Sequence, residues 1–402
     1  MSQMRVAVVG AGIAGLAFAA ALRRGGADCH VYEQAEHLAE VGAGVQLAPN
    51  ATRLLHRLGL RARLRAVAVA PEAIEMRRWD DGLMLQRTPL GDRCLRRFGA
   101  PYYTVHRADL HAALLSQLPP DRLHLGARLV AVTQDEAEAR LHMADGRTVA
   151  ADAVVGADGI HSAVREWFVA DWPRYSGQTI YRGLVPAERV PHLLAEPRVR
   201  LWFGPEQHCV CYPVSGGRQV SFGATVPAAS WEVESWSARG DVAGLRAAYK
   251  GWHDDVLRLL DAARNVSRWA LHDRDSTDRL GWGRVGVIGD AAHPMLPFQA
   301  QGANQAVEDA VVLARCLTEA GGAGAGRDAV RAALRRYERI RLPRTTRIQQ
   351  QSRANAETFH LADGAAQRRR DTGALAEPGL DRHRWLFGYD AEQAVATTGR
   401  SS

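Results

Sequence analysis

Three glycines and a glutamate near the start of the chain have the spacing of a dinucleotide-binding turn. Gly10, Gly12 and Gly15 follow an apolar, β-branched run and open an Ala-rich stretch that is predicted to be helical. In such a turn the first glycine permits the bend, the second admits a diphosphate, and the third lets the helix pack on the strand. The helix N-terminus faces the phosphates, and Glu33 is placed to accept a ribose hydroxyl. The pattern predicts a dinucleotide site, but by itself it does not distinguish FAD from NAD.

Two further motifs lie downstream, each directly after an apolar, strand-like run. Asp158 begins the sequence Asp-Gly-Ile-His-Ser-Ala-Val-Arg, and Asp290 belongs to the sequence Gly-Asp-Ala-Ala-His-Pro. The loop after Asp290 leads into a long predicted helix, which opens at Gly302, Ala303 and Asn304. Because a helix N-terminus carries partial positive charge, this end of the helix is suited to an anionic group.

In order and spacing, the three motifs resemble those of the single-component flavoprotein aromatic hydroxylases, the para-hydroxybenzoate hydroxylase superfamily. The resemblance extends to about residue 351. It is closest to the branch of salicylate hydroxylase, 3-hydroxybenzoate 6-hydroxylase and 6-hydroxynicotinate 3-monooxygenase. It implies that FAD is bound, that Asp158 serves FAD and the passing nicotinamide cofactor, and that Asp290 contacts the ribityl chain. It also places Gly302, Ala303 and Asn304 beside the flavin pyrimidine edge, where a positive helix end stabilises the anionic reduced flavin.

Two shorter segments resemble the surroundings of the flavin ring in that family. The sequence Gly-Val-Gln-Leu-Ala-Pro-Asn is similar to its flavin-ring loop, which assigns Gly44 and Val45 to the cofactor and Gln46 to the substrate. Arg107 ends a segment whose arginine contacts FAD in the family, and Pro297 is expected beside the substrate. The family's reaction implies that NADH or NADPH reduces the flavin. Molecular oxygen then forms a C4a-hydroperoxyflavin, which hydroxylates a phenolic aromatic acid.

A histidine and a tyrosine on one predicted strand are the candidates for substrate chemistry. Strand alternation places His208, Val210 and Tyr212 on the same face. A phenol becomes much more nucleophilic once deprotonated, and an imidazole titrates in the pH range that a base for this step requires. The hydroxybenzoate hydroxylases carry a His and a Tyr at this spacing, so the resemblance assigns His208 as the base and Tyr212 as a substrate hydrogen-bonding group. The alternative is a sheet histidine with a purely structural hydrogen bond.

Arg182 is the candidate for binding a substrate carboxylate. A guanidinium can hold a carboxylate through two parallel hydrogen bonds, although a surface or inter-domain salt bridge explains this arginine equally well. The hydroxynicotinate enzymes have a histidine in the loop that contains Gln46. The glutamine therefore favours a salicylate-like or hydroxybenzoate-like acid, and an amino-hydroxybenzoate-like acid is a further expected substrate. The residues do not choose among these acids, or between NADH and NADPH.

Other flavin-dependent functions fit parts of the same pattern. An epoxidase or an oxidative tailoring enzyme of a secondary metabolite would keep all three motifs, and a non-catalytic flavin redox sensor would need no substrate base. A flavin halogenase would require a Trp-x-Trp-x-Ile-Pro motif and an active-site lysine. That motif is absent from the sequence, and the only lysine is Lys250.

The three motifs require a cofactor domain that a second domain interrupts. The sequence predicts an α/β fold: a Rossmann-like FAD-binding domain with an inserted antiparallel-sheet substrate domain and C-terminal helices. The FAD-binding domain is expected over residues 1–171, with an excursion toward the substrate domain at 72–100, and again over 279–351. The substrate domain is expected over 172–278, and a C-terminal tail over 352–402.

Hydrophobic periodicity predicts the elements that carry these residues. Segment 77–99 is polar and is expected to be irregular. Helices are expected at 13–24, 50–64, 107–117, 303–319 and 327–351. Strands are expected at 5–10, 29–33, 122–133, 137–142, 152–156, 199–203, 209–214, 219–226 and 284–289.

Composition excludes several other classes of protein. The net charge is +7, but the basic residues are spread along the chain and interleaved with acids, unlike the clustered stripe of a nucleic-acid-binding protein. The five cysteines are scattered and no second Cys/His pair completes a metal site, which fits a reducing, cytoplasmic setting. The uncharged run Val6–Leu22 is short for a membrane span and is divided by glycines. We therefore expect a cytoplasmic protein without metal, nucleic-acid or membrane partners, as a monomer or homodimer.

Overall fold

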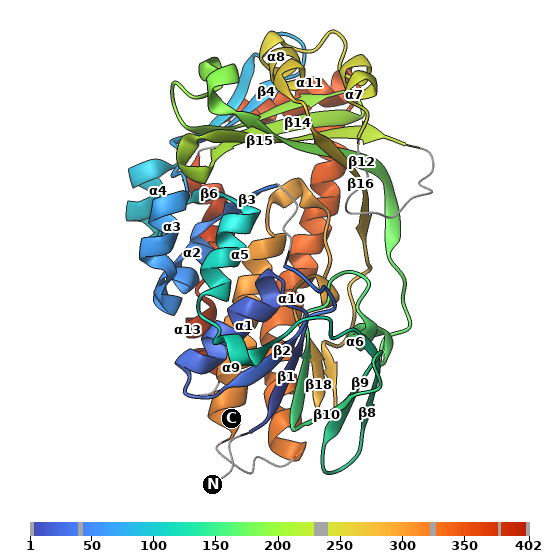
Figure 1. Cartoon of the computed structure of the whole chain (residues 1–402). Coiled ribbons are helices and arrows are strands. Elements are labelled where there is room, and N and C mark those ends of the chain that lie inside the picture. The colour runs from blue at the N-terminus through green and yellow to red at the C-terminus, as the bar shows by residue number, and fades with distance from the viewer. Residues whose placement is uncertain (1–3, 39–42, 229–239, 322–326, 377–378, 399–402) are drawn as a thin grey trace.

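The computed structural model describes residues 4–38, 43–228, 240–321, 327–376 and 379–398. A parallel sheet with its helices forms one end of the molecule, and a larger sheet lies across the other end (Figure 1). The long helix α10 (Arg327–Phe359) runs from the first sheet toward the second (Figure 1). The predicted α/β fold, with a parallel and a largely antiparallel sheet, is confirmed.

The parallel sheet has six strands in the order β17–β18–β11–β1–β2–β7. Only β17 runs antiparallel to its neighbour. β1 and β11 are buried at every residue, as expected of central strands whose two faces are both covered. The strand bounds are β1 (Val6–Val9), β2 (Cys29–Tyr32), β7 (Leu123–His124), β11 (Ala153–Gly156), β17 (Gly281–Trp282) and β18 (Val285–Val287).

The three predicted motifs leave this sheet at one edge. Gly10 follows β1, Asp158 follows β11, and Gly289 follows β18, three strands that are adjacent and parallel. Parallel strands end on the same side of a sheet, so motifs that are far apart in the sequence converge there. The position of the candidate site therefore follows from the strand order.

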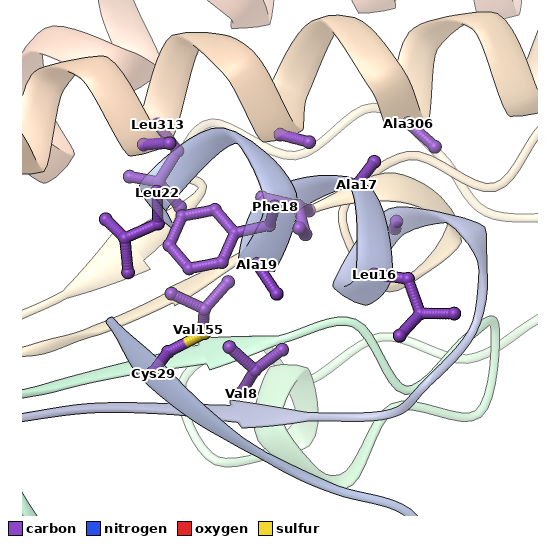
Figure 2. Close-up of a cluster of buried hydrophobic side chains, with 14 of the residues drawn as sticks. Val8, Leu16, Ala17, Phe18, Ala19, Leu22, Cys29, Val155, Ala306 and Leu313 are labelled. Carbon is purple, nitrogen blue, oxygen red and sulfur yellow. The ribbon is translucent and has the colours of Figure 1, made fainter. Parts of the chain in front are cut away.

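Helix α1 (Ile13–Arg24) lies between the sheet and helix α9 (Gly302–Ala320) (Figure 2). Phe18 is completely buried between these layers, among Val8 and Val155 of the sheet (Figure 2). Ala17 faces α9 at Ala306, where two small side chains allow the helices to pack closely (Figure 2). This packing fixes α9, and therefore its N-terminus, relative to the turn at the start of α1.

Smaller elements surround the parallel sheet. Strands β3 and β6 form an antiparallel pair in which Gly44 lies opposite His106, so the predicted flavin-ring loop lies beside the segment that ends at Arg107. Helices in this part of the chain are α2 (Pro49–Leu55), α3 (Arg61–Val67), α5 (Arg107–Leu115) and α6 (Ala163–Glu166). The remaining strands are β3 (Gly44–Leu47), β6 (Tyr103–His106), β8 (Leu129–Gln134), β9 (Ala139–Met143) and β10 (Thr148–Ala151).

The second sheet has seven strands in the order β16–β12–β15–β14–β13–β4–β5. One face packs Trp202, Cys209 and Cys211 against helices α7 (Val242–Ala248) and α8 (Asp254–Ala262). The opposite face looks toward the parallel sheet (Figure 1). The strand bounds are β4 (Ala73–Arg78), β5 (Met84–Pro89), β12 (Arg174–Pro186), β13 (Arg198–Gly204), β14 (Gln207–Val214), β15 (Gln219–Pro227) and β16 (Val266–Asp273).

The expectation that segment 77–99 is irregular is wrong. It contains the end of β4, all of the edge strand β5, and helix α4 (Gly91–Phe98). Polar residues obscure the hydrophobic alternation of β5 and the helical periodicity of α4. β5 buries the polar Gln86 and Thr88, and α4 buries only Cys94 and Phe98 among several charged side chains. Hydrophobic alternation therefore gives no signal in this segment.

Three predicted elements differ in extent from those in the structure. The helix expected at 50–64 is interrupted by a π-helical turn, His56–Leu60, where Gly59 adopts a φ of 86°. The strand expected at 122–133 is divided into β7 and β8. Helix α10 continues beyond residue 351 to Phe359, with Pro343 inside it. The tail adds the helices α11 (Ala365–Ala376), α12 (Arg384–Phe387) and α13 (Ala391–Thr398).

Candidate functional site

The first glycine-rich turn is closed toward the protein and open on one side. Gly10 has a φ of 101°, and a Cβ at this position would lie 2.5 Å from the carbonyl oxygen of Ala157. A Cβ on Gly15 would overlap the carbonyl oxygen of Gly10. A Cβ on Gly12, by contrast, would meet no atom within 4 Å. The turn thus needs Gly10 and Gly15 for its own folding, whereas Gly12 leaves space suited to a diphosphate at the helix N-terminus.

Glu33 is fixed at the end of β2 by two backbone donors. The amide of Ala11 donates to its Oε2 at 2.8 Å, and the amide of Ala35 donates to its Oε1 at 2.9 Å. Each carboxylate oxygen can accept more than one hydrogen bond. The residue therefore braces the turn and keeps acceptor capacity for a ribose hydroxyl.

Asp158 uses its carboxylate to shape its own loop. It accepts hydrogen bonds from the Ser162 hydroxyl at 2.5 Å and from the Val164 amide at 3.2 Å, at the start of α6. Burial raises the pKa of Asp158. Arg165, in the same motif, is buried and donates to the carbonyl oxygens of Ala291 and Ala292. The second motif thus supports the loop that carries Asp290.

Asp290 is accessible to solvent, although the surrounding protein raises the pKa of its carboxyl by desolvation. The charges of His293 and Arg107 act in the opposite direction and lower this pKa. A Cβ on Gly302 would lie 3.9 Å from the Asp290 Oδ1. The carboxylate therefore lies at the first turn of α9, reachable from outside and close to a positive helix end.

The amide of Asn304 joins α9 to the predicted flavin-ring loop. Its Oδ1 accepts from the Ala48 amide at 2.8 Å, and its Nδ2 donates to the Gln46 carbonyl at 2.9 Å and the Ala300 carbonyl at 2.8 Å. The side chain is completely buried. Asn304 therefore positions the loop, and its remaining donor toward a ligand is its backbone amide. First-turn amides of a helix have no acceptor within the helix, and here they belong to Gly302, Ala303 and Asn304.

A buried ionic network supports the first turns of α9. Arg341 contacts Asp309 at 2.7 Å and also bonds Glu308, and all three side chains are fully buried. Arg344 pairs with Glu308 at 2.7 Å. His293 bonds Asp309 at 2.5 Å, so it acts within this network. The Gly289 amide also donates to Asp309, at 2.9 Å, so the network ties the third motif to α9.

Replacing Arg341 with methionine should destabilise the protein by about 3–5 kcal/mol, because two buried carboxylates lose their common partner. The pKa values of Glu308 and Asp309 lie below their usual range in the fold, so the stabilisation from these carboxylates is present at neutral pH and is lost on acidification. Urea unfolding at pH 7 measures the change. Arg315, whose pair with Glu319 is partly exposed, is the control: Arg315→Met should cost less than about 1 kcal/mol. Equal losses for the two variants would contradict this assignment.

Strand register brings the predicted substrate residues onto one face of the seven-stranded sheet. Arg182 pairs with Gly223, which pairs with Val210, so these three residues form one row across β12, β15 and β14. His208 and Tyr212 flank Val210 on the same face, because they lie two residues to either side of it. The centre of this face is thus apolar, and the imidazole of His208, the hydroxyl of Tyr212 and the guanidinium of Arg182 surround it.

Tyr212 bridges the sheet and the predicted flavin-ring loop. Burial raises the pKa of Tyr212 to about 12, and the charge of Arg182 and the polar groups of Ser221 and Gln46 offset only part of this rise. The Ser221 hydroxyl accepts from the Gly44 amide at 2.9 Å, and the Tyr102 hydroxyl donates to the Gln46 side chain at 2.7 Å. Tyr212 and Gln46, both predicted to bind substrate, thus also hold each other.

His208 lies on the same face, on the side of Val210 away from Tyr212, and is buried. Its backbone amide donates to the Thr225 hydroxyl at 2.8 Å, and its Nδ1 lies 2.8 Å from the Nε2 of His360. Its ring lies edge-on to Phe298, with the centroids 5.2 Å apart. Pro297 opens the turn that carries Phe298, so the structure brings this turn next to His208. Burial lowers the pKa of His208 well below its usual value, and the neutral ring is therefore the dominant form at pH 7.

Arg182 is partly buried and lies over the ring of Trp269, 4.5 Å from its centroid. The pKa of this guanidinium falls to about 10, chiefly because of desolvation; Tyr212 opposes the shift and the charge of Arg107 adds to it. Within the described ranges, no carboxylate forms an ion pair with Arg182. The alternative of an inter-domain salt bridge is therefore not observed among these residues.

Sequence reasoning missed His360, Thr225 and Phe298. His360 follows α10 in a stretch that resembles no family motif, and Thr225 and Phe298 have the residue types of an ordinary sheet or turn. Only the contacts with His208 reveal them, and those contacts span 152 residues for His360 and 17 for Thr225.

Neither a metal centre nor a membrane span is found among the described residues. No group of three or more His, Cys, Asp or Glu side chains in these ranges is arranged to hold a metal ion. None of the helices that the structure describes is long and apolar enough to cross a membrane.

Comparison with known proteins gives consistent matches over the whole chain. The model of a family described as an FAD binding domain matches residues 3–352. A 3-amino-4-hydroxybenzoate 2-monooxygenase of Streptomyces platensis is 48% identical over 387 residues, 96% of each chain. A 6-hydroxynicotinate 3-monooxygenase of Bordetella bronchiseptica is 38% identical over 98% of each chain. A solved structure of a salicylate hydroxylase in complex with its substrate has a TM-score of 0.82 at 28% identity, covering 98% of each chain.

Proposed function

Because the chain belongs to the FAD-binding-domain family and is an FAD-dependent aromatic monooxygenase, we propose that its substrate is an amino-hydroxybenzoate-like acid. The observation that carries this choice is the 48% identity to a 3-amino-4-hydroxybenzoate 2-monooxygenase, compared with 38% to a 6-hydroxynicotinate 3-monooxygenase. Both matches cover nearly the whole of each chain. The presence of Gln46 where a histidine is expected in the hydroxynicotinate enzymes agrees with this choice.

In the proposed reaction, a ring C–H becomes C–OH. One oxygen atom of O₂ enters the ring and the other leaves as water, while NADH or NADPH supplies two electrons and is oxidised. Bound FAD would carry those electrons from the nicotinamide to oxygen. Gly12, Glu33 and Asp290 offer the open turn, the ribose acceptor and the accessible carboxylate that fit a flavin dinucleotide.

The sheet face would bind and activate the aromatic acid. Arg182 would hold the carboxylate, and the ring would lie over the apolar row formed by Gly223 and Val210. His208, neutral at pH 7, would accept the phenolic proton and make the ring electron-rich. Tyr212 would donate a hydrogen bond while keeping the flavin-ring loop in place.

Replacing Arg182 with glutamine should raise KM for the acid by roughly 10- to 150-fold, which corresponds to the loss of about 1.5–3 kcal/mol for a charged hydrogen bond. The control is 2-aminophenol, which lacks the carboxylate and should bind both enzymes with similar weakness. A KM change of equal size for both ligands would contradict a carboxylate role.

The test of the proposed function is a substrate panel with the purified holoenzyme. Oxidation of NADH and of NADPH is followed with 3-amino-4-hydroxybenzoate, salicylate, 3- and 4-hydroxybenzoate and 6-hydroxynicotinate, and the products are identified by mass spectrometry. The expected result is the highest kcat/KM, with hydroxylated product, for the amino-hydroxybenzoate. Hydroxylation of another acid with higher kcat/KM would overturn the substrate. Absence of stimulated oxidation with every acid would favour a redox sensor.

A further inference from the structure

His208 does not stand alone: it forms a stacked pair with His360. The His208 Nδ1 lies 2.8 Å from the His360 Nε2, with the ring centroids 5.1 Å apart and the planes 25° from parallel. The backbone carbonyl of His360 accepts from the Glu206 amide at 3.0 Å, which fixes the segment against β14. The second ring is therefore held in place and directed at the His208 Nδ1.

The two facing nitrogens must share one proton. Burial lowers the pKa of His360 to about 4 and that of His208 well below its usual value, so both rings are neutral at pH 7. A neutral imidazole has one N–H and one lone pair. If His208 donates from Nδ1, its Nε2 carries a lone pair and can act as a base. The tautomers of the two rings are thus coupled.

The outer nitrogens of the pair are open. Neither the His208 Nε2 nor the His360 Nδ1 has a hydrogen bond to a described residue. Neither atom is among the fully buried polar atoms without a partner. Both atoms therefore keep some accessible surface. The pair thus has one ring nitrogen without a protein partner at each end.

The neighbours of the pair are uncharged. The Thr225 hydroxyl lies 3.2 Å from the His208 Nδ1 and 3.5 Å from the His360 Nε2. The rings of Phe298 and Phe359 pack around His208 at 5.2 and 5.6 Å. Burial lowers the pKa of both rings, and His360 lowers that of His208 further, so neither ring is favoured as a resting place for a proton.

We propose that His360 is a positioning residue that relays the phenolic proton from His208 to solvent. The phenol O–H proton moves to the His208 Nε2, the His208 Nδ1 proton moves to the His360 Nε2, and the His360 Nδ1 proton leaves to water. The products are a bound phenolate, two neutral rings in their alternative tautomers and one proton in solvent. Protons returned when the ring regains aromaticity reset the pair by the reverse path. This inference rests on the proposed function, because it requires a phenolic substrate at His208.

The test compares His360→Gln and His360→Ala with His142→Gln, a histidine on the three-stranded sheet, in FAD-loaded enzyme. Glutamine can hold the His208 Nδ1 by a hydrogen bond but cannot relay a proton. We expect both His360 variants to lose on the order of 10-fold or more in kcat, short of the 10²–10⁴-fold of a lost base, with little change in KM. Their kcat should rise with buffer concentration, and imidazole should partly rescue His360→Ala. Wild type and His142→Gln should show neither effect.

The outcomes separate the relay from the proposed function. Wild-type hydroxylation together with full kcat and no buffer dependence in His360→Gln would overturn the relay alone. A loss of flavin or of thermal stability in the His360 variants, matching the loss of activity, would also overturn it, because His360 would then have a merely structural role. Absence of hydroxylation of any phenolic acid by wild type would overturn the proposed function, and the relay with it.

Discussion

His208→Ala should bind FAD normally and yet hydroxylate its substrate 10²–10⁴-fold more slowly, the usual contribution of a positioned base. The residue belongs to β14 and to none of the flavin motifs, so cofactor content should not change. Without a base, the phenol stays protonated and the ring is a poor nucleophile. Reduced nicotinamide should still be oxidised, with oxygen released as hydrogen peroxide instead of entering the ring.

The measurement is the ratio of hydroxylated product to NADH consumed, at matched flavin loading. Tyr212→Phe, on the same face, is the comparison: it should mainly raise KM, because it removes a hydrogen bond and not the base. Thermal unfolding of both variants checks that the sheet remains intact. An unchanged ratio and rate in His208→Ala would mean that the histidine only supports the sheet.

The second large effect is expected from Gly12→Val, which should abolish FAD binding without unfolding the protein. Gly12 adopts a φ of −75° and ψ of −173°, a backbone conformation that valine accepts, and a Cβ there meets no atom within 4 Å. The branched side chain would instead occupy the space through which a diphosphate approaches the backbone. All flavin-dependent activity should disappear with the cofactor.

Gly373→Val is the matched control, because a Cβ on Gly373 also meets no atom within 4 Å and the residue lies in α11, away from the three motifs. FAD affinity is measured by reconstituting apoprotein, and folding by circular dichroism. We expect a yellow, active control and a folded, colourless Gly12 variant. Normal FAD content in Gly12→Val would place the diphosphate elsewhere.

The cofactor end of the molecule could be predicted because its signals are local. The three glycines of the first turn and the helix after them are contiguous in sequence, and the sheet order then brings Asp158 and Asp290 to the same edge. The family predicted from the motif order is confirmed by the match over residues 3–352. The individual ligand contacts of these residues stay predictions.

The partners of the substrate residues could not be predicted, because they come from distant segments. His360 contacts His208 across 152 residues, and Asn304 holds Gln46 across 258. No periodicity encodes such pairs. The same limit explains β5, in which two of the three buried residues, Gln86 and Thr88, are polar and therefore have the pattern of a surface segment. Hydrophobic periodicity therefore fails to predict elements and contacts in which the buried residues are polar.

The central claim, that the chain is a monooxygenase for an amino-hydroxybenzoate-like acid, is tested most directly by following isotopic oxygen. The holoenzyme is supplied with 3-amino-4-hydroxybenzoate, NADH or NADPH, and ¹⁸O₂ in ordinary water, and the product is analysed by mass spectrometry. We expect one ¹⁸O atom per product molecule and one reduced nicotinamide consumed per hydroxylation. Product without ¹⁸O, or nicotinamide oxidation that yields only hydrogen peroxide with this acid, would contradict it.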